Sequence, residues 1–190
     1  MRTRGCPEGS GPLGDALGHV AVNVSAFEVV SPSFGRTVTD VLDDTGMDPA
    51  RLHLEVTESV TLEDPTRVRA VMKELKEVGV RFSLDGFGMG YLCLSYLRLL
   101  PFDSVTIDRS FVAGITGPDA TTRAIIGLGR ALRLPVVAEG VETAEQLAEV
   151  TALGVAFAQG FLLGPPLYVE DRERQVLDVH QGRLTPVSGI

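Results

Sequence analysis

Residues 80–91 have the sequence Val80-Arg81-Phe82-Ser83-Leu84-Asp85-Gly86-Phe87-Gly88-Met89-Gly90-Tyr91. The first part of this stretch is largely apolar and predicts a buried strand that ends at Asp85. Three glycines follow, and they allow the backbone to turn tightly. The lone carboxylate can hold one hard cation through oxygen, but it cannot bridge a pair of metal ions unaided. The stretch therefore predicts a strand that delivers an acid to a functional loop.

Strand-like segments alternate with helical ones along the chain. We expect strands at 19–24, 52–57, 80–85, 104–108, 135–139 and 156–160, and helices at 34–42, 65–78, 120–132, 143–153 and 167–179. This alternation indicates parallel β/α units. Acids at the strand ends predict a TIM-type (β/α) barrel with its site at the carboxyl ends of the strands. Because a complete barrel needs eight strands, we expect an α/β fold that is an incomplete barrel lacking about two N-terminal strands.

Two of the helices carry clear terminal signals. Asp64 precedes Pro65 as an N-cap acid before a proline at the first helical position, and Gly79 closes the same segment. Thr143 and Gln146 form the spacing of a capping box at the start of a later helix. These signals predict where the two helices begin and where the first of them ends.

The composition predicts one globular domain. Of the 190 residues, 44% are hydrophobic and 22% are charged, which is enough to form a sizeable core. We expect a poorly ordered lead-in at 1–18 and a domain at 19–185. No apolar run approaches the ~20 residues that span a bilayer, and no signal segment opens the chain, so we expect a cytoplasmic protein without a membrane partner. The net charge of −8 argues against binding a nucleic acid polymer.

Five of the expected strands end in a side chain with an oxygen donor. They are Asn23, Glu55, Asp85, Glu139 and Gln159. Each one alone is typical of a helix cap, a turn or a solvated loop charge, but five at five strand ends favour a common pocket. Carboxylate and amide oxygens are the ligands that Mg²⁺ and Mn²⁺ prefer, so the set predicts a site for one of these cations.

The chain resembles the EAL domain family of cyclic di-GMP phosphodiesterases over about residues 20–167. The matching segments occur in the family's order and close to its spacing. They are Val22-Asn23-Val24-Ser25, Leu54-Glu55-Val56-Thr57-Glu58-Ser59, residues 85–91, Ser95-Tyr96-Leu97, Leu100-Pro101, Ile107-Asp108-Arg109-Ser110-Phe111-Val112, Val137-Ala138-Glu139-Gly140-Val141-Glu142-Thr143 and Gln159-Gly160-Phe161. A resemblance of this length is far more specific than a single short motif.

The resemblance implies a role for each strand-end residue and for one loop residue. Asn23, Glu55 and Asp85 would ligate a catalytic metal. Glu139 would serve a second metal or its bound water, and Gln159 would lie near that water. Glu58 would tether the loop at 85–94, which in the family couples dimerisation to the metal site. The implied reaction is in-line hydrolysis of one phosphodiester of cyclic di-GMP to pGpG between two metal ions.

The chain departs from the family pattern at three points that affect this chemistry. The strand with the Glu-Ala-Leu signature has no counterpart, so the resemblance is to an N-terminally truncated and degenerate EAL domain. Gly86 stands in place of the second aspartate, and Thr106 in place of the lysine that orients the attacking water. Losing one acid or base group typically lowers the rate by ~10²–10⁴. We therefore expect at most one weakly held Mg²⁺ or Mn²⁺ and little or no hydrolysis.

Three functions remain open from the sequence. The first is a catalytically inactive module of cyclic di-GMP signalling that binds cyclic di-GMP or a partner protein. The second is a residual metal-dependent phosphodiesterase that forms pGpG when another chain supplies the absent strand. The third is a fragment without a function of its own. The sequence also leaves open whether the chain forms a homodimer or binds a partner chain.

Overall fold

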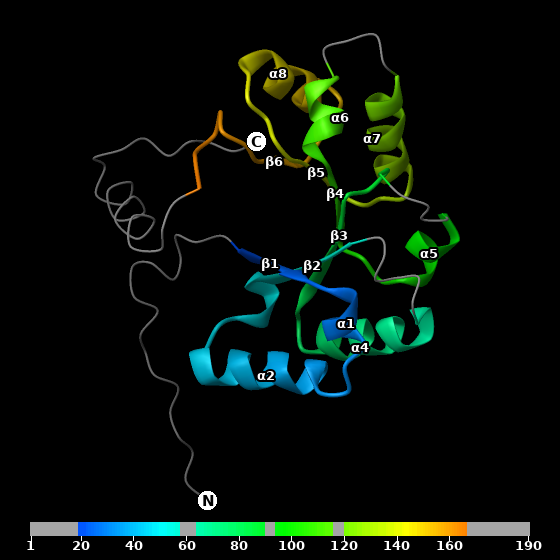
Figure 1. The fold of residues 1–190 in the computed structure, drawn as a ribbon, viewed down its shortest axis with the longest axis vertical. Coiled ribbons are helices and arrows are strands. Elements are labelled where there is room, and N and C mark those ends of the chain that lie inside the picture. The colour runs from blue at the N-terminus through cyan, green and yellow to red at the C-terminus, as the bar shows by residue number, and fades with distance from the viewer. Residues whose placement is uncertain (1–18, 58–63, 90–93, 116–119, 167–190) are drawn as a thin grey trace, which may run out of the picture. The chain divides into compact units, whose positions relative to one another are not determined.

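The computed structural model describes residues 19–57, 64–89, 94–115 and 120–166 (Figure 1). By its internal contacts, the chain divides into a unit of residues 19–165 with 189–190 and a second unit of residues 1–18 and 166–188. Apart from Pro166, the second unit lies outside the described residues. The expected lead-in at 1–18 and the expected helix at 167–179 therefore fall outside the description. The proposed domain limits, 19–185, stay a prediction.

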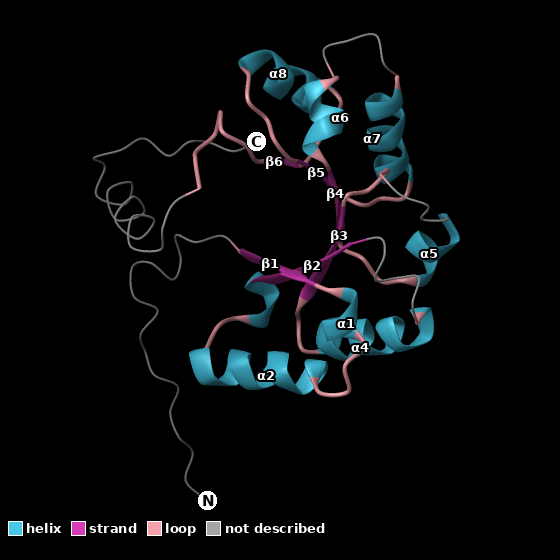
Figure 2. Cartoon of the chain, viewed as in Figure 1, coloured by secondary structure: helices cyan, strands magenta, loops and turns pink. Residues whose placement is uncertain are grey.

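The first unit is built on one sheet of six parallel strands in the order β1-β2-β3-β4-β5-β6. The strands are β1 (Val20–Val24), β2 (Leu52–Thr57), β3 (Arg81–Asp85), β4 (Ser104–Ile107), β5 (Val136–Ala138) and β6 (Phe157–Ala158). All six coincide with segments predicted from the sequence, and β2 has the predicted limits. The strands follow one another along an arc, and the helices lie on its outer side (Figure 2). The prediction of parallel β/α units arranged as part of a barrel is confirmed.

Helices follow most of the strands. They are α1 (Ala26–Val29), α2 (Phe34–Thr45), α4 (Pro65–Glu77), α5 (Leu94–Leu99), α6 (Arg109–Ala113), α7 (Thr121–Ala131) and α8 (Ala144–Ala152), with a 3₁₀ turn η1 (Pro49–Arg51). The sequence predicted α2, α4, α7 and α8. It did not predict α1, α5, α6 or η1, because three to six residues are too few to show a helical period. No helix in the described part of the chain is long and apolar enough to cross a membrane.

The predicted helix termini are present as hydrogen-bonded caps. Asp64 Oδ1 accepts a hydrogen bond from the backbone N–H of Arg67 at 2.9 Å, which caps α4. Gly79 follows the end of α4 with a φ of 109°, a left-handed conformation that favours glycine. The capping box at the start of α8 is complete: Thr143 Oγ1 accepts from the N–H of Gln146, and Gln146 Oε1 accepts from the N–H of Thr143. These caps fix where each helix begins beside its strand.

The two faces of the sheet differ in polarity because successive side chains of a strand point to opposite faces. The helix-covered face is apolar and buried, with Leu54, Val56, Phe82, Leu84, Val105, Ile107 and Val136. The register pairs Asn23 with Glu55, Glu55 with Ser83, and Thr57 with Asp85, so these residues share the opposite, inner face. The core therefore lies between sheet and helices, and the inner face is left free for polar side chains.

Strands β1 and β6 form the ends of the sheet among the described residues. On the outer face of β1, Val20 and Val22 are 41% and 42% exposed. At the amino ends of the strands, the ring of His19 stacks on His53 with centroids 4.4 Å apart and meets the edge of Phe157 at 6.4 Å. Since His19 precedes β1 and Phe157 begins β6, the sheet curves far enough to bring its two ends into contact there.

Candidate functional site

Three acids lie along one edge of the sheet, where strands β2, β3 and β5 end. Glu55 is near the end of β2, Asp85 is the last residue of β3, and Glu139 directly follows β5. Parallel strands end at the same edge of a sheet, so their terminal side chains share one region. Glu55 and Glu139 both feel the charge of Asp85, and Glu139 also feels that of Glu55. The structure thus brings together the three acids that the sequence singled out.

The environment of Glu55 and of Glu139 favours the protonated form of each. Burial is the largest cause that raises the pKa of Glu55, and the charge of Asp85 raises it further. Burial likewise raises the pKa of Glu139, with smaller contributions from Asp85, Glu55 and Asp108, to about 7. Burial disfavours an ionised carboxyl because it removes water, and nearby like charges add to that effect. Glu139 is therefore divided between its neutral and ionised forms near neutral pH.

Gln159 is hydrogen-bonded to Glu139. Gln159 Nε2 donates to Glu139 Oε1 at 2.6 Å, and this bond partly opposes the rise in the pKa of Glu139. Backbone bonds hold the pair in place, since the N–H of Glu139 donates to Ile107 O at 3.1 Å and the N–H of Gln159 donates to Ala138 O at 2.8 Å. These bonds continue the pairing of β4, β5 and β6 past the strand ends. The predicted neighbours Glu139 and Gln159 are in direct contact.

Asn23 lies beside the acids at the first strand. It pairs with Glu55 in the register of β1 and β2, and it is exposed. Its amide oxygen is therefore on the same face as the carboxylates, at the open end of the sheet. Glu58, the predicted loop tether, lies outside the described residues, as do residues 90–93 of the loop that it would hold.

Thr106 lies on β4, between the strand β3 that ends at Asp85 and the strand β5 that precedes Glu139. Thr106 and its neighbour Ser83 are called the floor of the site below. Thr106 is completely buried on β4, and its Oγ1 lies 3.2 Å from Ser83 Oγ on β3 in a hydrogen bond that either hydroxyl can donate. Its backbone carbonyl accepts from the N–H of Phe87 at 2.8 Å. The position where the family pattern places a lysine thus holds a neutral hydroxyl pair, and it adds no positive charge to the acids.

Gly86 follows Asp85 in a left-handed conformation with a φ of 71°. A Cβ built on Gly86 would meet no atom within 4 Å. Aspartate and asparagine adopt left-handed φ values more readily than other non-glycine residues do. An aspartate at this position therefore has room, and although the left-handed φ strains any side chain, aspartate is among the residues that adopt this conformation most readily.

Asp108 is a fourth acid of the region, and the sequence analysis did not count it as a site residue. It directly follows β4, its Oδ1 accepts from the N–H of Ser110 at 2.8 Å at the start of α6, and its charge raises the pKa of Glu139. The signal was present in the sequence, because Asp108 also follows an apolar strand. Its additional function as a helix cap explains why an acid at a strand end is ambiguous before the structure is seen.

The donors at this edge are of the kind that a hard divalent cation takes, namely carboxylate and amide oxygens. Among the described residues, however, no group of three His, Cys, Asp or Glu side chains lies close enough to hold a metal ion. Glu55, Asp85 and Glu139 are near enough to repel one another, but they do not converge on one point. A cation would have to draw them together.

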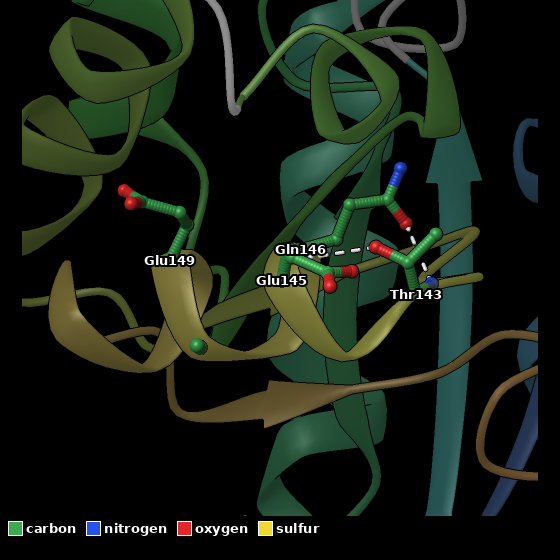
Figure 3. Close-up of a pocket in the computed structure, with 5 residues that line it drawn as sticks. Thr143, Glu145, Gln146 and Glu149 are labelled. Atoms are coloured by element: carbon green, nitrogen blue, oxygen red, sulfur yellow. Dashed lines mark hydrogen bonds between the residues drawn. The ribbon is translucent and has the colours of Figure 1, made fainter.

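A pocket lies on the first two turns of α8 and at its N-cap. It is lined by Thr143, Glu145, Gln146, Ala148 and Glu149, and the capping-box bonds cross it (Figure 3). Two carboxylates, those of Glu145 and Glu149, line the pocket. The Glu149 carboxylate already has a cationic neighbour, because its Oε2 lies 3.6 Å from Arg123 Nη2 on α7. The pocket contains none of the strand-end donors, and we assign it no part in the site.

Comparisons with known proteins agree on one family. The family model described as EAL domain matches residues 12–166. The bifunctional diguanylate cyclase/cyclic di-GMP phosphodiesterase MucR of Pseudomonas aeruginosa is 40% identical over 160 residues, which cover 83% of this chain and 23% of that protein. Its solved phosphodiesterase, a c-di-GMP complex, has a TM-score of 0.75 at 39% identity, with 81% of this chain and 64% of that chain covered.

Two further solved structures extend the comparison. The EAL domain of Mycobacterium smegmatis DcpA has a TM-score of 0.78 at 36% identity, with 84% of this chain and 73% of that chain covered. The manganese and cyclic di-GMP complex of Klebsiella pneumoniae BlrP1 has a TM-score of 0.71 at 30% identity, with 82% and 42% covered. The chain spans about a fifth of the length of the curated relatives that it matches.

Proposed function

The chain belongs to the EAL domain family, and on that premise we propose that it is a cyclic di-GMP-binding module with little or no phosphodiesterase activity. Binding depends on one weakly held divalent cation at the strand-end acids. The proposal fits a family whose solved members include complexes with cyclic di-GMP and with manganese.

The observation that carries this proposal is the state of Thr106. Thr106 is completely buried on β4, and its hydroxyl is hydrogen-bonded to that of Ser83, at the position where the family pattern places a lysine. A buried hydroxyl pair cannot supply the positive charge that would hold an attacking water against an anionic phosphodiester. The hydrogen bond between Thr106 and Ser83 supports the proposal that this site works without a lysine at position 106.

The remaining donors support binding of a cation. Glu55 and Asp85 would bind the cation, and the Asn23 amide would lie beside them at the open end of the sheet. The positive charge of the cation would attract the phosphate oxygens of the ligand. Glu139 is kept partly neutral by burial and by its acidic neighbours, so a bound cation would favour its ionised form. Gln159 would hold the orientation of Glu139 through their hydrogen bond.

The expected loss of hydrolysis follows from the groups that are changed. A two-metal reaction needs ligands for both cations, and Gly86 offers none at the position of the second aspartate. Loss of a positioned acid or base group lowers the rate by about 10²–10⁴ by itself. Together these changes favour ligand binding over turnover.

Titration calorimetry of the purified chain with cyclic di-GMP, with and without Mn²⁺, tests the proposal. We expect Mn²⁺-dependent binding that Glu55→Ala abolishes and that Glu77→Ala, at the exposed end of α4, leaves unchanged. Chromatography of the same samples should show no pGpG. Binding that is absent in both conditions contradicts the proposal.

A second candidate is a residual phosphodiesterase, and the Glu139–Gln159 pair favours it specifically. A carboxyl with a pKa of about 7 beside an amide is suited to exchange a proton with water. Formation of pGpG by the unmodified chain, lost in Glu139→Gln, would support this function over the first. In the double variant Gly86→Asp with Thr106→Lys, recovered turnover would show that these two positions are what limits the reaction.

A further inference from the structure

Met89 ends the tight turn that follows Asp85. Its N–H donates to Gly86 O at 3.0 Å, which closes the turn, and its residue is 62% exposed. The hydroxyl of Ser110, on α6, donates to Met89 Sδ at 3.5 Å. This contact links the turn after β3 to the helix after β4, two segments that the sequence separates by 21 residues.

Ser110 is held firmly on its side of the contact. Its N–H donates to Asp108 Oδ1 at 2.8 Å in the cap of α6, so the hydroxyl projects from a fixed helix start. A thioether sulfur is a weak hydrogen-bond acceptor, and the contact as found restrains the turn little. If the side chain of Met89 carried a stronger acceptor, the Ser110 hydroxyl would already be placed to donate a hydrogen bond to it.

The methionines of the described residues differ sharply in access to solvent. Met72 lies in the core and is completely buried, and Met47 is partly buried against the core. Met89 is open to water and to small oxidants. Because oxidation of methionine follows exposure, Met89 should react before the other two.

We propose that Met89 is an oxidation site, and that Ser110 receives the resulting sulfoxide and fastens the turn after Asp85 to α6. The oxidant is hydrogen peroxide. One oxygen atom passes from peroxide to sulfur: the O–O bond breaks, an S–O bond forms, the sulfur loses two electrons, and the peroxide leaves as water. The sulfoxide oxygen is a far stronger acceptor for the hydrogen bond from the Ser110 hydroxyl than the thioether sulfur is.

The turn is well placed to transmit this change. It begins at Asp85, and the N–H of Phe87 within it donates to the carbonyl of Thr106 at 2.8 Å on the floor of the site. With the bond at Phe87 and a second anchor at Met89, the turn is restrained at two points, so we expect Asp85, which precedes it, to lose freedom to move. The consequence for cation binding, which rests on the proposed function, is tighter binding of Mn²⁺ by the oxidised chain.

Peptide mass spectrometry after peroxide treatment tests the first step, and amide hydrogen exchange of residues 86–89 tests the second. We expect Met89 to gain one oxygen well before Met47 and Met72, and exchange in the turn to slow by about fivefold, the effect of one ordinary hydrogen bond. Ser110→Ala should be oxidised as readily but show no slowing, because only the hydroxyl is lost. Met89→Leu should show neither change.

Equal oxidation of Met47 and Met89 would overturn the proposal, and so would the same exchange rate before and after oxidation in the unmodified chain. Both readouts concern the turn alone and need no ligand. Calorimetry with Mn²⁺ on the two forms is scored separately: failure of Mn²⁺ to bind either form counts against the proposed function, while the mass and exchange data still decide the oxidation site.

Discussion

Glu139→Gln should stabilise the metal-free protein, and the gain should depend on pH. The substitution keeps the shape of the side chain and a partner for Gln159, but it removes an ionisable group whose pKa is raised from 4.5 to about 7. At ~1.36 kcal/mol for each tenfold change in proton affinity, ionised Glu139 costs the folded state at most about 3.4 kcal/mol. Glu139 is only partly buried, so solvent screening reduces this figure, and we expect a gain of about 1–2 kcal/mol.

The sign follows from proton linkage. Between pH 4.5 and about 7, the folded protein holds a proton on Glu139 that the unfolded chain releases, so the free energy of unfolding falls as the pH rises through this window. Above about pH 7 the full penalty is present, and below 4.5 it is absent. The advantage of Glu139→Gln should therefore be largest at pH 8 and nearly gone at pH 4.5.

Urea unfolding with EDTA at pH 8 and pH 4.5 measures the effect, and thermal melting should show a shift of roughly 2–8 °C at pH 8. Glu77→Gln, a matched change at the exposed end of α4, serves as the control and should give no comparable difference between the two pH values. A Glu139→Gln variant that is less stable than the unmodified protein at pH 8, or equally stabilised at both pH values, would refute the reasoning.

Three further substitutions test how the site is supported. Gly160→Ala should destabilise the protein by about 1–3 kcal/mol, since its Cβ would collide with a neighbouring backbone segment, whereas Gly164→Ala, with nothing within 4 Å, should have little effect in urea unfolding. Asp103→Ala should lower the free energy of unfolding by about 1–3 kcal/mol, because the Asp103 carboxylate accepts a hydrogen bond from the N–H of the buried Phe82 at 2.9 Å. An unchanged midpoint of urea unfolding would contradict this. Thr143→Ala removes the cap of α8 and should cost about 1 kcal/mol, seen as faster amide exchange in its first turn.

The repeating unit of this fold could be predicted because its signals are local. An apolar segment ending in an acid, followed by a capped helix, needs only neighbouring residues to be recognised, and Asp64 and Thr143 cap their helices as predicted. The short helices α1, α5 and α6 were missed for the same reason. A segment of four to six residues is too short to show a helical period in its apolar residues, and such short helices are stabilised by packing against the rest of the fold.

The sequence by itself predicted which strands carry Glu55, Asp85 and Glu139 near their carboxyl ends. Its resemblance to the EAL family implied that Gly86 and Thr106 replace an aspartate and a lysine. Only the tertiary structure decided how these groups act on one another. The pKa of Glu139 near 7 comes from burial and from charges on other strands, and the neutrality of the floor comes from a hydroxyl on β3 meeting one on β4. Such effects depend on distances between segments far apart in the chain, and a linear pattern does not contain those distances.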